Sequence, residues 1–169
     1  LREEVTALID VVAEGDEVIM RLESPGGAVQ GYGLAASQLA RLSERGIPLT
    51  VCVDKVAASG GYMMACVAER IVAAPFAIVG SIGVAAPTPN FHRLLDRHGV
   101  DFENFTAGKY KRTVSFLAPH TDEGRAKYQA QLDETHDLFK AFVKGHRPAL
   151  DIDRVATGEY WLGTRALEL

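Results

Sequence analysis

Three glycine-rich junctions at the ends of apolar segments constrain the fold of this chain most strongly. They are SPGG at residues 24–27, ASGG at 58–61 and GSIG at 80–83. Strand-like and helix-like segments alternate at short spacing around them, which predicts an α/β domain with a largely parallel sheet. In such sheets, functional residues gather where the ends of strands meet the starts of helices. The junctions are therefore the first places to look for chemistry.

Hydrophobic periodicity predicts the elements around the junctions. Helical spacing covers residues 1–14, 32–46, 61–69, 89–99 and 121–145. Apolar runs predict strands over residues 16–24, 47–53, 70–75 and 77–84. The 61–69 helix is apolar on nearly every face, so we expect it to be buried. The 121–145 helix carries a narrow apolar stripe, which predicts either a core face or a seam for a partner helix.

Composition sets broad limits on the function. The 169 residues fit a single domain over residues 1–169, which would bury about 70% of its unfolded surface. A net charge of −4 gives no electrostatic reason to expect a nucleic acid as a partner. Cys52 and Cys66 lie in apolar runs, which favours buried free thiols over a bridge. The longest apolar run, residues 71–87, is interrupted by Pro75 and Gly80 and predicts two buried strands instead of a membrane helix.

Ser59 stands at the second junction among small residues, directly before an apolar helix. A sharp turn from a strand into a helix, with small neighbours and an exposed hydroxyl, is what a nucleophile elbow requires. The N–H group after the serine would face the same space, where the oxyanion of an acyl-transfer intermediate needs a donor. The alternative is a serine that caps the N-terminus of a buried helix. The residues of this junction alone do not decide between the two.

The first and third junctions also have simple alternatives. Gly26 and Gly27 would let the backbone approach a ligand and turn its N–H groups outward, ahead of a helix start that favours negative charge. The same residues are more typical of an ordinary turn. Around Ser81, a β-turn between two apolar strands explains the sequence without any function. Neither junction predicts a site by itself.

A serine hydroxyl is a weak nucleophile and needs a nearby base. A lysine base must lose about three pKa units to be neutral near pH 7, and burial or a neighbouring positive charge causes such a loss. Lys55 lies beside Asp54, whose charge favours the protonated form. Lys109 and Lys111 lie in one loop, and composition does not choose between them. The histidines lie among charged residues or at helix edges, which favours solvated positions for all five: His92, His98, His120, His136 and His146.

Four motifs occur together and in order along the chain. They are SPGG at 24–27, ASGGY at 58–62, GSIG at 80–83 and GKYK at 108–111. Each is common alone, but the ordered set resembles the signal peptide peptidase A (protease IV) family of serine proteases over essentially the whole chain. The resemblance implies a ClpP/crotonase-like α/β fold, a spiral of parallel strands flanked by helices. It also implies a Ser/Lys dyad, and we expect neither a metal nor a cofactor.

The resemblance implies a role for each matched residue. Ser59 matches the nucleophile of the family's Ser-Gly-Gly-Tyr motif. Lys111, directly after the tyrosine in Gly-x-Tyr-Lys, matches the general base. Ser81 matches a serine that hydrogen-bonds this lysine, and Gly27 and Gly60 match the backbone donors of the oxyanion hole.

The chain departs from the family pattern at a few positions. Lys109 occupies the variable position before the tyrosine. Met63 follows Tyr62 where many members have a second aromatic residue, and Arg112 stands where several have an acidic or small residue. These departures bear on substrate choice and leave the matched dyad intact. The family's N-terminal membrane anchor and the GLVD-type segment expected after Leu169 have no counterpart, so we expect a trimmed protease core.

The leading hypothesis is a serine endopeptidase that cleaves hydrophobic or signal-peptide-like peptides. The family implies a homo-oligomer that assembles the dyad across a protomer or domain boundary, at the bacterial inner membrane, with the protease domain on the periplasmic side. We expect an apolar substrate groove near Ile78, Ile82, Val84 and Met63. Two alternatives keep the fold: a crotonase-type acyl-CoA enzyme, in which the serine is idle, and a non-catalytic scaffold, which needs neither dyad residue.

Overall fold

Three strands form a parallel sheet that is buried on one face. The computed structural model describes all residues from 1 to 169. Strands β1 (Val18–Arg21), β2 (Leu49–Val53) and β4 (Arg70–Ala73) lie in the order β1-β2-β4, and both pairs are parallel. On the central strand, Leu49, Val51 and Val53 are at most 1% exposed. The predicted parallel α/β arrangement is therefore confirmed.

A second sheet continues from the first along the chain. Strand β3 (Val56–Ala58) pairs with β5 (Ile78–Gly80) in parallel, and β5 pairs with β6 (Tyr160–Leu162) in antiparallel orientation. Neither β3 nor β6 was predicted, because each is only three residues long and its partner strand lies elsewhere in the chain. The predicted 77–84 strand is shorter than expected and ends at the third junction.

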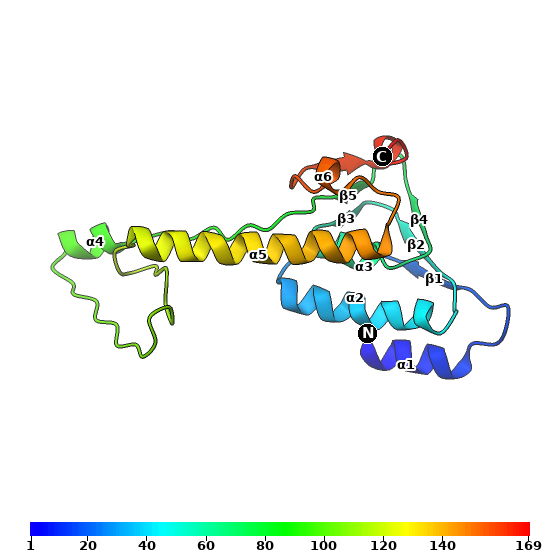
Figure 1. Ribbon diagram of the computed structural model, residues 1–169, viewed down its shortest axis with the longest axis horizontal. Coiled ribbons are helices and arrows are strands. Elements are labelled where there is room, and N and C mark those ends of the chain that lie inside the picture. The colour runs from blue at the N-terminus through cyan, green and yellow to red at the C-terminus, as the bar shows by residue number, and fades with distance from the viewer. The chain divides into compact units, whose positions relative to one another are not determined.

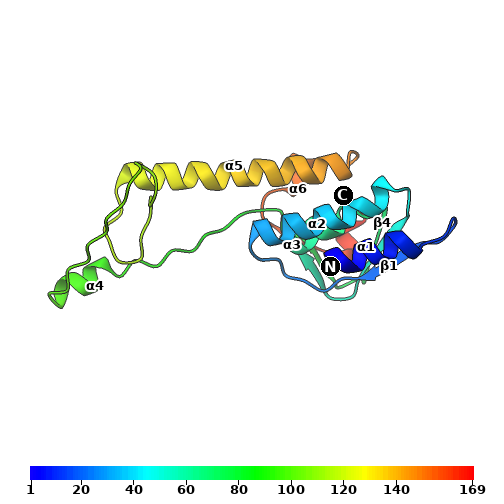
Figure 2. The same ribbon diagram turned by 90° about the horizontal axis from the view of Figure 1, so that it is seen from below.

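Helices cover the buried face of the first sheet. Helix α1 (Arg2–Val11), helix α2 (Val29–Glu44) and helix α3 (Gly60–Ala65) agree with three of the predicted helices. Helix α2 contacts both α1 and α3 and lies between them (Figure 1), and Figure 2 shows α1 beside α2 from below. Helix α3 is buried along most of its length, as its apolar sequence predicted.

The chain divides into two units. The first comprises residues 1–83 and 138–169, and the second comprises residues 84–137. Helix α5 (Asp122–His146) crosses this division, and within the first unit its Phe139 and Val143 belong to the core. The core alternative for the apolar stripe is thus correct at Phe139. The single protease domain over residues 1–169 stays a prediction.

The remaining helices are short. Helix α4 (His92–Arg97) lies in the second unit, and α6 (Ile152–Val155) and α7 (Gly163–Ala166) lie in the first. Of the five histidines predicted to be solvated only His98 is exposed, and the other four are half-buried: His92, His120, His136 and His146. The ring of His120 also lies within hydrogen-bond distance of Ser115 and Asn90. No helix of the structure is both long enough and apolar enough to span a membrane.

Both cysteines are free, as predicted. Cys66 is fully buried, and burial raises the pKa of its thiol to about 12. Cys52 is half-buried. A buried thiol with so high a pKa is an inert core residue, so Cys66 offers no nucleophile that would compete with a serine.

Candidate active site

The three glycine-rich junctions lie side by side in the first unit. Ser24 forms a parallel bridge with Ala57, and Ala58 pairs with Gly80. The junctions that follow these residues are therefore neighbours at the carboxyl ends of their strands. This is the edge of a parallel sheet at which ligands bind in α/β proteins.

Ser59 connects β3 directly to α3 in an unusual backbone conformation. Its φ is 52° and its ψ is −122°, a combination that only glycine adopts readily. The Ser59 N–H donates to the Gly80 carbonyl at 2.8 Å, which fixes the turn against β5. The side chain makes no capping hydrogen bond to α3. The helix-cap alternative is therefore wrong, and the geometry is that of a strained strand-to-helix elbow.

Ser81 occupies the equivalent position after β5. Ser59 follows Ala58 and Ser81 follows Gly80, and Ala58 and Gly80 are paired across the two strands. The φ of Ser81 is also 52°. Its N–H donates to the Glu159 carbonyl at 2.8 Å, and its hydroxyl donates to the Gly158 carbonyl at 3.3 Å. The two serines thus end adjacent parallel strands. Within the first unit the Ser81 hydroxyl is bonded to the backbone.

Gly26 brings the first junction against Ser59. Its φ is +93°, and a β-carbon there would lie 2.7 Å from both the β-carbon of Ser59 and the backbone nitrogen of Gly60. Only a residue without a side chain allows this approach. The Pro-Gly-Gly run predicted a close backbone approach, and the structure shows that Gly26 approaches Ser59 and Gly60.

Gly27 and Gly60 carry the candidate oxyanion donors. Gly60 is the first residue of α3, so its N–H has no partner within the helix. Neither the Gly27 N–H nor the Gly60 N–H donates a hydrogen bond within residues 1–169. The N–H of Gly26, by contrast, donates to the Ser24 hydroxyl at 3.2 Å. The amides at positions 27 and 60 thus have no acceptor within the chain.

The candidate bases differ in their surroundings. Lys109 forms an ion pair with Glu123, and this hydrogen-bonded partner raises the pKa of the Lys109 amine. Lys55 pairs with Glu23 at 3.2 Å. Lys111 lies in the second unit and is exposed there. Every residue of the loop at 106–112 is exposed.

The predicted apolar groove is wrong at two of its four residues. Ile82 and Met63 are 1% and 5% exposed and belong to the core. Ile82 instead lines a small apolar cavity of about 140 Å³ together with Tyr62 and Trp161. Apolar character alone did not distinguish core residues from groove residues. Ile78 and Val84 are half-buried.

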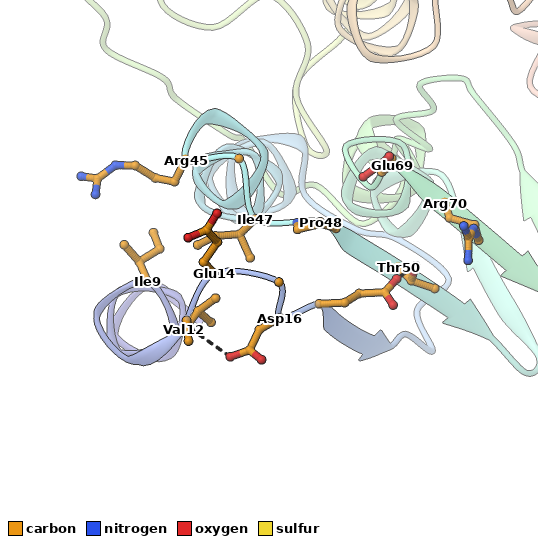
Figure 3. Close-up of a pocket in the computed structure, with 14 residues that line it drawn as sticks. Ile9, Val12, Glu14, Asp16, Arg45, Ile47, Pro48, Thr50, Glu69 and Arg70 are labelled. Atoms are coloured by element: carbon orange, nitrogen blue, oxygen red, sulfur yellow. Dashed lines mark hydrogen bonds between the residues drawn. The ribbon is translucent and has the colours of Figure 1, made fainter.

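A larger cavity lies away from these junctions. It has a volume of about 990 Å³ and is lined by residues that precede β1 and β2 and by Arg70 at the start of β4. Figure 3 shows its charged side chains, among them Asp16, whose carboxylate accepts a hydrogen bond from the Ala13 N–H at 2.9 Å. These are the amino ends of the strands, so this cavity is separate from the serine elbow.

Comparison with models of known protein families identifies the family to which this chain belongs. Residues 41–169 match the model of peptidase family S49, and residues 1–39 match the model of the peptidase family S49 N-terminal region. The chain belongs to peptidase family S49. The family to which the ordered motifs pointed is thus confirmed, and the S49 match covers the serine elbow and both lysines of the 109–111 loop.

Relatives within the S49 family cover nearly the whole chain. A Haemophilus influenzae protein named "Probable protease SohB" is 61% identical over 169 residues, which are 100% of this chain and 48% of that protein. "Protease 4" of the same organism is 30% identical over 89% of this chain and 25% of its own length. The chain spans about half the length of the curated SohB relatives that it matches.

Similarity to solved structures is much weaker. A crystal structure of an enoyl-CoA hydratase from Mycobacterium smegmatis aligns with a TM-score of 0.35 and 17% identity. The alignment covers 93% of this chain and 70% of that one. A similarity at this level carries no argument about activity.

Proposed function

We propose that this chain is the core of a serine endopeptidase that uses a Ser59/Lys111 dyad. The observation that carries the proposal is the conformation of Ser59. A non-glycine residue held at positive φ costs on the order of 1–3 kcal/mol, and such strain is concentrated at functional sites. Membership of a peptidase family and the neighbouring free amides support the same chemistry.

In the proposed acylation step, the Ser59 Oγ forms a bond to the carbonyl carbon of the scissile peptide. Its proton passes to the neutral amine of Lys111. The carbonyl oxygen takes the negative charge and accepts hydrogen bonds from the N–H groups of Gly27 and Gly60. The C–N bond then breaks, and the leaving amine takes the proton from Lys111. A water molecule repeats these transfers on the acyl-enzyme, releases the acid and restores Ser59.

The proposed substrates are hydrophobic or signal-peptide-like peptides at the bacterial inner membrane, with this domain on the periplasmic side. The support for this location and substrate class is the resemblance of the motifs to signal peptide peptidase A. Ser81 is proposed to hydrogen-bond Lys111 in the assembled enzyme. Its hydroxyl would then exchange the Gly158 carbonyl, at 3.3 Å, for the amine.

Covalent labelling tests the nucleophile. We expect a fluorophosphonate probe to label the full-length protein in membranes at Ser59, because the strained hydroxyl and the free amides complete an acyl-transfer site. Ser59→Ala should remove the label. Ser37→Ala is the matched control, since the Ser37 hydroxyl is exposed on α2 and bonds to the Gly33 carbonyl. Peptide mapping of the adduct identifies the modified residue.

An unlabelled wild-type protein would contradict the proposal. That outcome is the one expected of an acyl-CoA enzyme, in which the serine takes no part, and of a non-catalytic scaffold. Label on a serine other than Ser59 would contradict it equally.

We also propose that the active enzyme is a homo-oligomer. Lys111 is exposed within its own unit, whereas a lysine that acts as a base must be withdrawn from water. Burial by another copy supplies the desolvation that a neutral amine needs. Size-exclusion chromatography with light scattering should show that peptidase activity elutes only with the oligomer. Activity in a monomer peak would contradict this proposal.

A further inference from the structure

The ring of Tyr32 touches both glycines of the proposed oxyanion hole. Helix α2 begins directly after the first junction, so Tyr32 lies in its first turn. A β-carbon on Gly60 would lie 2.7 Å from Cδ2 of Tyr32, and one on Gly27 would lie 2.9 Å from Cε2. Real β-carbons essentially never come this close to another atom. One edge of a single ring therefore packs directly against the backbone at both donor positions.

The hydroxyl of Tyr32 also has a hydrogen-bond partner in the first junction. It lies 2.8 Å from the Oγ of Ser24, whose side chain is buried. The backbone of Ser24 is itself fixed to β3, because its N–H donates to the Val56 carbonyl and its carbonyl accepts from Ala58. The same Ser24 Oγ accepts from the Gly26 N–H. Tyr32 thus links the start of α2, the first junction and the start of α3.

We propose that Tyr32 is a positioning residue that sets the separation of the Gly27 and Gly60 N–H groups. This inference rests on the proposed function, in which those groups bind the oxyanion. Neither group donates a hydrogen bond within the chain, so no hydrogen bond of its own fixes either one. The Tyr32 ring is the contact that the two glycines share.

The separation of the two N–H groups matters because oxyanion donors act only over a narrow range of distances. They must lie about 2.7–3.1 Å from the developing oxyanion, and loss of one donor costs about 10²–10³ in kcat. A displacement of about 1 Å costs on the order of 10²-fold. Removing the ring leaves both glycine backbones free to shift by that much. The hydroxyl of Tyr32 is bonded to Ser24, so it acts on the hole only through the position of the ring.

A pair of substrates separates this role from general structural support. The probes are a hydrophobic peptide ester and its thionoester, in which sulfur replaces the carbonyl oxygen. Sulfur is larger and a weaker hydrogen-bond acceptor, so the oxyanion hole contributes less to thionoester hydrolysis. The ratio of the two kcat/KM values therefore reports the contribution of the two donors. A loss of folded protein would lower both values by the same factor and leave the ratio unchanged.

In the full-length protein, we expect Tyr32→Ala to lower kcat for the ester by about 10²-fold, with KM within about twofold. Thionoester turnover should fall by about tenfold at most, so the ratio falls by about tenfold or more. Tyr32→Phe keeps the ring and should lose only about fivefold, the effect of one hydrogen bond. Tyr128→Ala is the matched control, a half-buried tyrosine of α5 whose loss should leave the ratio unchanged.

Equal losses on both substrates would overturn the inference, and so would a loss in Tyr32→Phe as large as that in Tyr32→Ala. If Tyr32→Ala does not fold, Tyr32→Leu takes its place under the same criterion. Phosphonate labelling distinguishes the two levels of failure. If the wild-type protein is not labelled at Ser59, the proposed function itself is contradicted. If the wild type is labelled at Ser59 but Tyr32→Ala has the same ester-to-thionoester ratio as the wild type, only the role of Tyr32 is contradicted.

Discussion

Ser59→Gly should abolish peptide hydrolysis and at the same time stabilise the fold by about 1 kcal/mol. The hydroxyl is the proposed nucleophile, so its loss removes covalent catalysis, which we expect to lower kcat by at least about 10⁴-fold. The stabilisation follows from φ 52° and ψ −122°, because glycine adopts this conformation without a steric cost. Part of the relief is offset by the greater entropy that glycine gives the unfolded chain. Thermal and urea unfolding, with peptide turnover, measure the two effects.

Two control variants isolate the strain. Ser59→Ala keeps a β-carbon at positive φ, so it should lose turnover equally but gain little stability. Ser37→Gly makes the same change inside α2, where glycine is unfavourable, and should destabilise the fold by about 1 kcal/mol. A Ser59→Gly protein that unfolds more easily than wild type would contradict a strained elbow. One that still hydrolyses peptides would contradict the role of Ser59.

The junctions could be predicted from the sequence because glycine marks them locally. Paired glycines after an apolar run require a tight turn, and Ser59 between two alanines and two glycines indicated either an elbow or a helix cap, of which the structure shows the elbow. The alternation of strands and helices predicted parallel pairing, although β3, whose pairing with β5 places two of the junctions together, was not predicted. Strand β5 ends at Gly80, where its junction begins, whereas β1 ends at Arg21, three residues before Ser24.

Contacts distant in sequence could not be predicted in this way. Strand β6 lies about eighty residues after its partner β5, and no turn signal joins the two. Tyr32 looked like one more aromatic residue of a helix, and only the structure shows its ring against Gly27 and Gly60. The exposure of Lys111 could not be read from its loop either, because burial depends on what packs over a loop and not on the composition of the loop.

Lys111→Ala should abolish turnover, whereas Lys109→Ala should leave it close to the wild-type level. The two lysines share one loop but differ in their partners. Lys109 is paired with Glu123, which raises the pKa of its amine and favours the protonated form, so it is poorly suited to act as a base. Lys111→Arg should be as inactive as Lys111→Ala, because a guanidinium remains protonated in proteins. Loss of turnover in Lys109→Ala with retention in Lys111→Ala would reverse the assignment.

The double variant Ser59→Ala/Lys111→Ala gives the sharpest form of this prediction. If Lys111 acts only by taking the proton of Ser59, it has no function once the hydroxyl is gone. The double variant should then lose no more activity than Ser59→Ala alone, as expected for residues that work as one unit. Independent contributions would multiply instead, because separate losses of transition-state stabilisation add as free energies. Multiplicative losses, measured as kcat/KM on one peptide ester, would therefore show that Lys111 acts on the substrate and not through Ser59.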